Sequence, residues 1–172
     1  MAHRSVAVDG AGPTYDEYVA TRWTVLYRTA YLLTGSHADA EDLAQAALVK
    51  AYLSWSKVSG AASPDAYVRR ILTNAFLSGR RPLRVVREHL VDRPPEVAAA
   101  DPANEDRFVL WPHIAALSPR QRAVVVLRYY EDLSEQQIAD LLGCSTGTVK
   151  STASDALHVL RNRIAATEGD PA

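Results

Sequence analysis

Apolar residues recur at helical spacing in both halves of the chain. The clearest repeat runs from Val68 to Phe76, where apolar residues stand at i, i+3, i+4, i+7 and i+8. Sustained alternation with period two, bounded by hairpin turns, is absent from the sequence, although residues 123–127 taken alone would fit a buried strand. The pattern therefore predicts an all-α protein.

Residues that start and stop helices delimit two helices at the beginning of the chain. Thr14 and Glu17 have the spacing of a capping box, in which each side chain binds a free backbone N–H group at a helix start. A helix is predicted from there to about Leu33, and Gly35 is suited to end it. Ser36 then caps a second helix, rich in Ala and Leu, that runs to about residue 55.

A loop and a third helix follow. Residues 56–63 contain Gly60 and several serines and are predicted to form the loop. Ser63 and Pro64 supply an N-cap and a first-turn proline for the third helix. Its apolar stripe leaves the polar residues on its other faces: Arg69, Arg70, Thr73, Asn74 and Arg81. One face of this helix is expected to pack and another to be basic.

Prolines mark a boundary between two domains. They stand at Pro82, Pro94, Pro95 and Pro102, in a weakly periodic stretch that mixes arginines with acids. We predict a flexible linker over residues 82–103. It joins two small helical domains, at residues 14–81 and 104–166.

The second domain is predicted to contain four helices. The first covers residues 104–117, and Ser118 and Pro119 begin the next, which ends near Tyr130. A capping box at residues 134–137 starts the third helix.

The last two helices have the pattern of a helix-turn-helix motif. Gly143 ends the third helix, and the last helix runs from about Thr146 to Ala165. The small Ala139 stands where the second helix of such a motif crosses the first. The spacing favours DNA binding, with a plain helical hairpin as the alternative.

The last helix separates apolar from polar residues. Its inward stripe is predicted to comprise Val149, Ala153, Ala156, Leu157, Leu160 and Ile164. The residues that project outward are Thr148, Ser151, Ser154, Asp155 and His158, with Lys150 on the flank. Short polar side chains and one lysine suit the reading of a DNA groove.

Charge is balanced overall and concentrated locally. Lys and Arg total 19 against 20 Asp and Glu, so a DNA-binding surface has to be local. Arginines gather from the third helix onward, at Arg69, Arg70, Arg80, Arg81, Arg84, Arg87 and Arg93. They indicate either contacts with DNA phosphates or a solvated helix C-terminus, where cations interact favourably with the helix dipole.

Three acids begin the second helix, at Asp39, Glu41 and Asp42. The helix dipole alone would account for acids at this end. A patch that docks another protein is the sharper hypothesis.

The composition excludes several classes of protein. The single cysteine, Cys144, forms no intramolecular disulfide and no cysteine-rich metal cluster, which is compatible with a reducing cytoplasm. Residues 1–12 lack the apolar core of a signal peptide, and the longest apolar run, residues 123–127, is too short to cross a bilayer. We predict a cytoplasmic protein with no membrane partner.

One motif imitates a catalytic one. Residues 143–147 match G-x-S-x-G, the nucleophile elbow of α/β-hydrolases, but that elbow follows a strand and here a helix is predicted. The chain has no H-E-x-x-H motif and no phosphate-binding loop. We therefore expect no enzyme activity, no catalytic residues, no metal ligands and no cofactor.

The motifs together resemble the extracytoplasmic-function sigma factors, small sigma-70-type proteins that keep region 2 and region 4. In the first half the resemblance rests on Leu32-Leu33-Thr34-Gly35, Asp39 to Gln45, Ala66 to Ile71, Asn74 and Arg80-Arg81. In the second half it rests on Leu117 to Arg122, Leu127 to Tyr129, Ser134 to Gly143 and Gly147 to Ser151. It covers about residues 15–166.

The resemblance implies partners and roles. Core RNA polymerase would be bound at its clamp helices by Asp39, Glu41, Asp42 and Gln45. The −10 element of promoter DNA would be bound by Arg69, Arg70, Asn74, Arg80 and Arg81, while residues 56–63 hold a flipped base. The −35 element would be bound by Arg122, Thr148, Lys150, Ser151 and Ser154. An anti-sigma factor is a further candidate partner.

Two residues depart from the family pattern. Many family members have an arginine where this chain has Asp155, and an acid where it has Ala46. Asp155 would repel phosphate unless it accepts a hydrogen bond from a cytosine amino group. A helix-turn-helix repressor or activator, and more remotely a sigma mimic that occupies polymerase, are the alternative functions. The acidic second helix paired with a basic third helix favours the sigma factor, because an ordinary repressor does not need both.

Overall fold

The computed structural model describes residues 12–79 and 111–168, and within them the regular structure is entirely helical. The predicted linker at residues 82–103, Arg80, Arg81 and the beginning of the helix expected at 104–117 lie outside the described residues. Residues 111–114 are helical, as expected for the end of that helix. None of the described helices is long and apolar enough to cross a membrane.

Four helices form the first domain: α1 (Tyr15–Thr34), α2 (His37–Leu53), α3 (Trp55–Ser59) and α4 (Pro64–Leu77). The predicted helix boundaries are confirmed at α1, where Thr14 and Glu17 form a capping box and Gly35 adopts a left-handed φ of 74°. Ser36 caps α2 and Ser63 caps α4 through their side-chain oxygens. Local sequence thus sets where each long helix begins.

The expected loop at residues 56–63 is partly wrong, because α3 occupies its first half. Val58 is fully buried, and the Trp55 ring packs against Tyr15 and Tyr18 with centroid separations of 5.4 and 5.3 Å. Burying these two apolar side chains favours a helical turn over an exposed loop. A turn remains between α3 and α4.

The predicted packing face of α4 is confirmed at Val68, Leu72 and Ala75, which are buried. The prediction for Thr73 is wrong. This residue was expected on a polar face, but it is fully buried, and its hydroxyl has no hydrogen-bond partner among the described residues. The position is buried because α2 packs against α4 as well as against α1. Threonine can fill it because its side chain has nearly the shape of valine.

The second domain contains α6 (Pro119–Val125), η3 (Val126–Tyr130), α7 (Glu135–Leu142) and α8 (Thr146–Glu168). The helix expected to end near Tyr130 does so, but its last five residues form a π-helix. Ser134 and Gln137 form the predicted capping box, and Gly143 ends α7 with a left-handed φ of 63°. Helix α8 follows and completes the helix-turn-helix.

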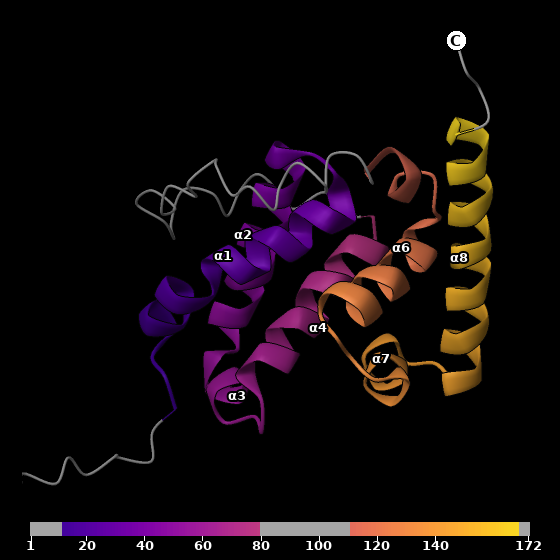
Figure 1. The fold of residues 1–172 in the computed structure, drawn as a ribbon. Helices are drawn as coiled ribbons and strands as arrows, with labels where there is room; N and C mark the ends of the chain where they lie inside the picture. The colour runs from indigo at the N-terminus through magenta and orange to yellow at the C-terminus, as the bar shows by residue number, and fades with distance from the viewer. Residues whose placement is uncertain (1–11, 80–110, 169–172) are drawn as a thin grey trace, which may run out of the picture.

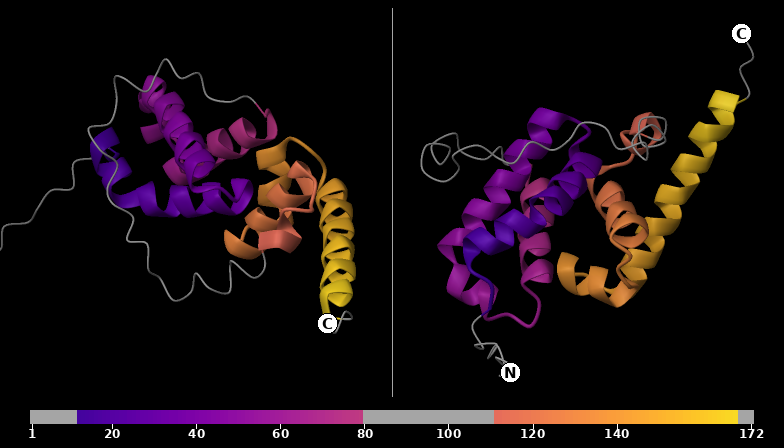
Figure 2. Two further views of the ribbon diagram at one scale, coloured as in Figure 1. Left: turned by 90° about the horizontal axis from the view of Figure 1, so that it is seen from above. Right: turned by 60° about the vertical axis from the view of Figure 1, so that its left-hand side comes forward.

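The two domains lie against each other. Helices α6 and η3 sit beside α1 and α4, and α8 forms the outer edge of the molecule (Figures 1 and 2). Ala123 and Val126 are buried in the same apolar cluster as Leu26, Leu33 and Leu72 of the first domain. A second cluster, which includes Val124, Ile138 and Val149, holds the helix-turn-helix together.

Gly35 serves two purposes at the junction of α1 and α2. Its positive φ is costly for other residues, and Trp111 lies so close that a Cβ on residue 35 would overlap the indole ring. Gly143 has a similar φ, but a Cβ there would meet nothing within 4 Å. A substitution at Gly143 would therefore strain the backbone alone, whereas a substitution at Gly35 would also displace the Trp111 ring.

We expect Gly35→Ala to lower the free energy of unfolding by more than Gly143→Ala. The left-handed backbone costs an alanine roughly 1 to 2 kcal/mol at either position, and displacement of Trp111 adds about 1 to 3 kcal/mol at position 35 only. Urea unfolding of both variants measures the difference. Equal losses would show that Trp111 does not pack on Gly35 in solution.

Candidate nucleic-acid interface

The outer face of α8 is open to solvent. Thr148, Ser151, Ser154 and Asp155 are all exposed, as the sequence predicted, while Val149, Ala153 and Ala156 are buried beneath them. The Ser145 hydroxyl accepts a hydrogen bond from the Thr148 backbone N–H at 3.1 Å and so caps the helix. The first turn of α8 contains no acid, so no carboxylate of that turn offsets its positive dipole end.

Lys150 lies on the flank of this face and forms an ion pair with a neighbour. Its Nζ lies 3.5 Å from Oε2 of Glu135, whose Oε1 accepts a 2.6 Å hydrogen bond from Arg128. The hydrogen bond from Arg128 is the main reason that the pKa of Glu135 lies below its usual value, with Lys150 adding to the effect. Glu135 thereby links η3, the start of α7 and the start of α8.

Helix α4 presents two of the predicted −10 residues to solvent. Arg70 and Asn74 are exposed and stand one turn apart, on the side opposite the buried Val68 and Leu72. They form a small polar surface with one cation. This surface could contact phosphate and base edges together.

Arg69, from the same predicted set, points elsewhere. Its Nε donates a 3.0 Å hydrogen bond to Oε2 of Glu131, which follows η3 in the other domain. The other carboxylate oxygen of Glu131 accepts a hydrogen bond from the hydroxyl of Thr29 on α1. The structure therefore separates Arg69 from Arg70 and Asn74.

Arg122, from the predicted −35 set, is not grouped with the exposed face of α8. Its guanidinium donates to the backbone oxygens of Leu33 at 2.8 Å and Ala115 at 2.9 Å, and it lies 5.3 Å from the centroid of the Trp111 ring. Burial lowers the pKa of Arg122 from its usual value. Arg122 binds the end of α1 in this conformation.

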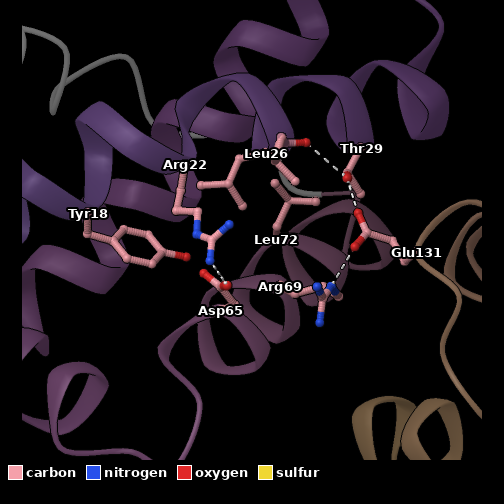
Figure 3. A pocket seen from close by; sticks show the side chains of 9 residues that line it. Tyr18, Arg22, Leu26, Thr29, Asp65, Arg69, Leu72 and Glu131 are labelled. Carbon is pink, nitrogen blue, oxygen red and sulfur yellow. Dashed lines mark hydrogen bonds and ion pairs between the residues drawn. The ribbon is translucent and has the colours of Figure 1, made fainter. Parts of the chain in front are cut away.

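A small pocket lies where α1 and α4 meet η3 (Figure 3). Two ion pairs line it: Arg22 with Asp65 at 2.7 Å, and Arg69 with Glu131. Tyr18 also faces it, and burial, followed by the charge of Asp65, raises the pKa of its hydroxyl. The pocket belongs to the contact between the domains.

The acidic patch predicted on α2 is distributed around the start of that helix. Asp39 is exposed in the first turn, where its backbone N–H donates to the Ser36 hydroxyl at 3.3 Å. Glu41, Asp42 and Gln45 are half-buried. The patch therefore offers one exposed carboxylate and three partly covered polar groups.

Sequence reasoning missed Trp111, Arg128 and Glu131. Each contacts a residue of another helix or of the other domain. Trp111 packs on Gly35, Arg128 donates to Glu135, and Glu131 accepts from Thr29 and Arg69. Glu131 could have been noticed as an acid directly after an apolar and aromatic helix. Nothing in its neighbourhood along the chain indicates its partners, 62 and 102 residues away.

Profiles of two sigma-70 regions match the chain. Sigma-70 region 2 matches residues 19–84, and sigma-70 region 4 matches residues 114–158. The RNA polymerase sigma-E factor of Streptomyces coelicolor is 38% identical over 91% of this chain and 89% of its own length. The ECF RNA polymerase sigma factor SigL of Mycobacterium tuberculosis is 36% identical over 86% of this chain and 84% of its own.

Solved structures agree on the fold. The sigma factor RpoE in complex with the anti-sigma factor NepR, from Bartonella quintana, has 25% identity and a TM-score of 0.63, covering 86% of this chain and 94% of its own. CnrH in complex with the cytosolic domain of CnrY has 20% identity and a TM-score of 0.60, covering 88% of each chain. At 20% identity, the likeness to CnrH shows a shared fold and nothing further.

We expect Arg128→Met to raise the pKa of Glu135 toward its ordinary value of 4.5. Because the folded-state pKa is lowered, the pair stabilises the fold above the unfolded pKa, and this contribution disappears as pH falls through the folded pKa. The difference in unfolding free energy between wild type and Arg128→Met should therefore be full at pH 7 and shrink below about pH 4.5.

NMR titration of the Glu135 carboxyl measures the shift directly. Arg161→Met removes an exposed cation from α8 and serves as the control, because Arg161 is not among the groups that shift Glu135. An unchanged Glu135 titration in Arg128→Met would contradict the assigned hydrogen bond.

Proposed function

The chain belongs to the extracytoplasmic-function group of the sigma-70 family of RNA polymerase sigma factors, and from that premise we propose that α4 and α8 divide the binding of promoter DNA between them. As a sigma factor it functions in promoter recognition and transcription initiation by RNA polymerase. The observation that carries the proposal is that each matched region exposes one polar helix face.

Helix α8 is the proposed reader of the −35 element. Its hydroxyl-bearing residues Thr148, Ser151 and Ser154 share one exposed face, and its first turn is free of acids. A helix with its N-terminal end in the major groove can place such side chains on base edges and its dipole near phosphate. Lys150 is the proposed phosphate contact, and the exposed Asp155 is proposed to accept from a cytosine amino group.

Helix α4 is the proposed binder of the −10 element. Arg70 and Asn74 are exposed on it, and Arg69, Arg80 and Arg81 complete the proposed set. Melting a promoter requires unpaired bases to be held, and cations along the backbone together with a pocket for a base offset the cost of unpairing. The turn after α3 is the proposed place for the flipped base.

The start of α2 is the proposed surface for core polymerase. Asp39 lies in the first turn, where the helix dipole stabilises an acid independently of any partner, and Glu41, Asp42 and Gln45 follow in the next two turns. The absence of an acid at Ala46 makes this patch smaller than in many family members. We propose that it binds the clamp helices of polymerase.

A regulatory protein is a further proposed partner, since a related sigma factor was solved with its anti-sigma factor. The chain is also proposed to act in the cytoplasm and to catalyse no reaction with its own residues, as expected for a regulatory subunit of polymerase.

A free-standing repressor remains the competing function. It differs in one measurable property, which is binding without polymerase.

Purified protein mixed with core polymerase should start transcription from promoters of a genomic library, while the protein alone should bind the same duplexes weakly. Run-off transcription and gel-shift titration of the same DNA fragments compare the two. Tight, sequence-specific binding without core, combined with no transcription in its presence, would establish the repressor instead.

Lys150→Ala should reduce the salt dependence of promoter binding by holoenzyme, lowering the slope of log K against log [salt] by about 1. Lys50→Ala is the matched control, because Lys50 is an exposed lysine at the end of α2. An unchanged slope in Lys150→Ala would remove this residue from the phosphate contacts.

A further inference from the structure

Glu135, the first residue of α7, lies between two cations of the helix-turn-helix domain. Its Oε1 accepts a 2.6 Å hydrogen bond from Nη1 of Arg128, and its Oε2 lies 3.5 Å from Nζ of Lys150. The side chains of Glu135 and Arg128 are 27% and 32% exposed, whereas that of Lys150 is 65% exposed. One carboxylate thus serves a cation from η3 and a cation from α8.

The helix dipole explains only part of this arrangement. It stabilises an acid in the first turn of α7, wherever that side chain points. The direction of the carboxylate comes from Arg128, whose guanidinium is held in turn by the ring of Tyr129, with Cζ 5.7 Å from the ring centroid. Because the hydrogen bond from Arg128 also lowers the pKa of Glu135, the carboxylate is charged at neutral pH. A negative charge therefore stands beside the start of α8.

The two contacts of Glu135 differ in strength. The 2.6 Å contact with Arg128 is a short, charge-assisted hydrogen bond. The 3.5 Å separation from Lys150 exceeds the length of an ordinary hydrogen bond, and the lysine side chain is mostly in water. Lys150 can therefore turn from Glu135 to another anion while Arg128 keeps the carboxylate in place.

A DNA phosphate at Lys150 would meet this carboxylate. A phosphate oxygen that binds Nζ at about 3 Å would lie roughly 6 Å from the Glu135 carboxylate. Repulsion between two unit charges at that separation lowers the affinity about threefold at the dielectric constant of water, and by more where the groove excludes water. A lysine that is already paired also displaces fewer counter-ions from DNA.

We propose that Glu135 sets the strength with which α8 binds DNA, because it competes with phosphate for Lys150. The proposal rests on the proposed assignment of α8 and Lys150 to the −35 element. Hydrogen bonds from hydroxyl groups to base edges act at short range, so the carboxylate leaves the proposed base contacts of Thr148, Ser151 and Ser154 unchanged. Glu135 weakens the sequence-independent part of binding and leaves sequence discrimination to these residues.

The test compares Glu135→Gln with wild type in holoenzyme assembled from the full-length chain. Glutamine keeps the shape of the side chain and an oxygen that can accept from Arg128, while the charge is removed. Affinity is measured over a series of salt concentrations for a promoter fragment selected by run-off transcription. The same fragment with a scrambled −35 element provides the comparison.

Asp140→Asn is the matched control for net charge. Asp140 is exposed on the same helix, and its Oδ1 accepts a 2.9 Å hydrogen bond from the neutral Gln136. Removing its charge alters the net charge of the domain equally and leaves the ion pair of Lys150 in place.

We expect Glu135→Gln to raise the affinity for both fragments about threefold or more at low salt. The slope of log K against log [salt] should become steeper by up to about 1. The ratio of the two affinities should stay at its wild-type value, and Asp140→Asn should stay near wild type in every measurement.

Three results would overturn the proposal. A lower affinity in Glu135→Gln would show that the carboxylate positions Lys150 for DNA instead of competing with it. A changed ratio between the fragments would show that Glu135 reads a base. An equal gain in Asp140→Asn would show that net charge alone is responsible.

The Lys150→Ala background separates this proposal from the proposed function. In that background Glu135→Gln should change affinity no more than Asp140→Asn does, and a full effect there would overturn the proposal. A wild-type slope in Glu135→Gln, together with a reduced slope in Lys150→Ala, would overturn the proposal and leave the proposed function standing. Wild-type slopes in both single variants would exclude Lys150 from the phosphate contacts and overturn both.

Discussion

A carboxylate that is taken out of water needs a cation or hydrogen-bond donors, and Glu131 finds a cation in Arg69 and a donor in Thr29, both in the other domain. This requirement determines how the two halves of the chain meet, because Thr29 and Arg69 have to face the end of η3 together. The apolar contacts of Ala123 and Val126, and the packing of Trp111 on Gly35, follow the same alignment. Polar and apolar contacts therefore meet along the same boundary between the domains.

The contacts within each domain are of another kind. Both domains have their own buried cluster, and the helix-turn-helix is further fixed by Glu135, which joins Arg128 and Lys150. Such contacts do not depend on how the domains are placed.

Most of the fold could be predicted from the sequence, because helix boundaries are encoded within a few residues. Thr14 with Glu17, and Ser134 with Gln137, identify helix starts three residues apart, and Gly35 and Gly143 mark the ends. The errors arose where packing overrides local pattern. Val58 draws residues 55–59 into a helix, and Thr73 is buried despite its hydroxyl.

The candidate site was predictable to the extent that it depends on one helix. The exposed face of α8 follows from helical periodicity, so Thr148, Ser151 and Ser154 were placed correctly on the surface, and their contacts with DNA stay a prediction. Arg69 and Arg122 were predicted to share surfaces with residues near them in the sequence, but the structure places them elsewhere. Their partners lie 62 and 89 residues away, and such separations leave no periodic trace in a sequence.

The central claim is that α4 and α8, as proposed, contact separate elements of a promoter. Energy transfer between dyes at Ser78→Cys, after α4, and Arg161→Cys, on α8, measures this in a Cys144→Ser background. The account predicts less transfer in promoter-bound holoenzyme than in the free chain, because the two helices then contact separate elements of the DNA. Equal transfer in both states would contradict it.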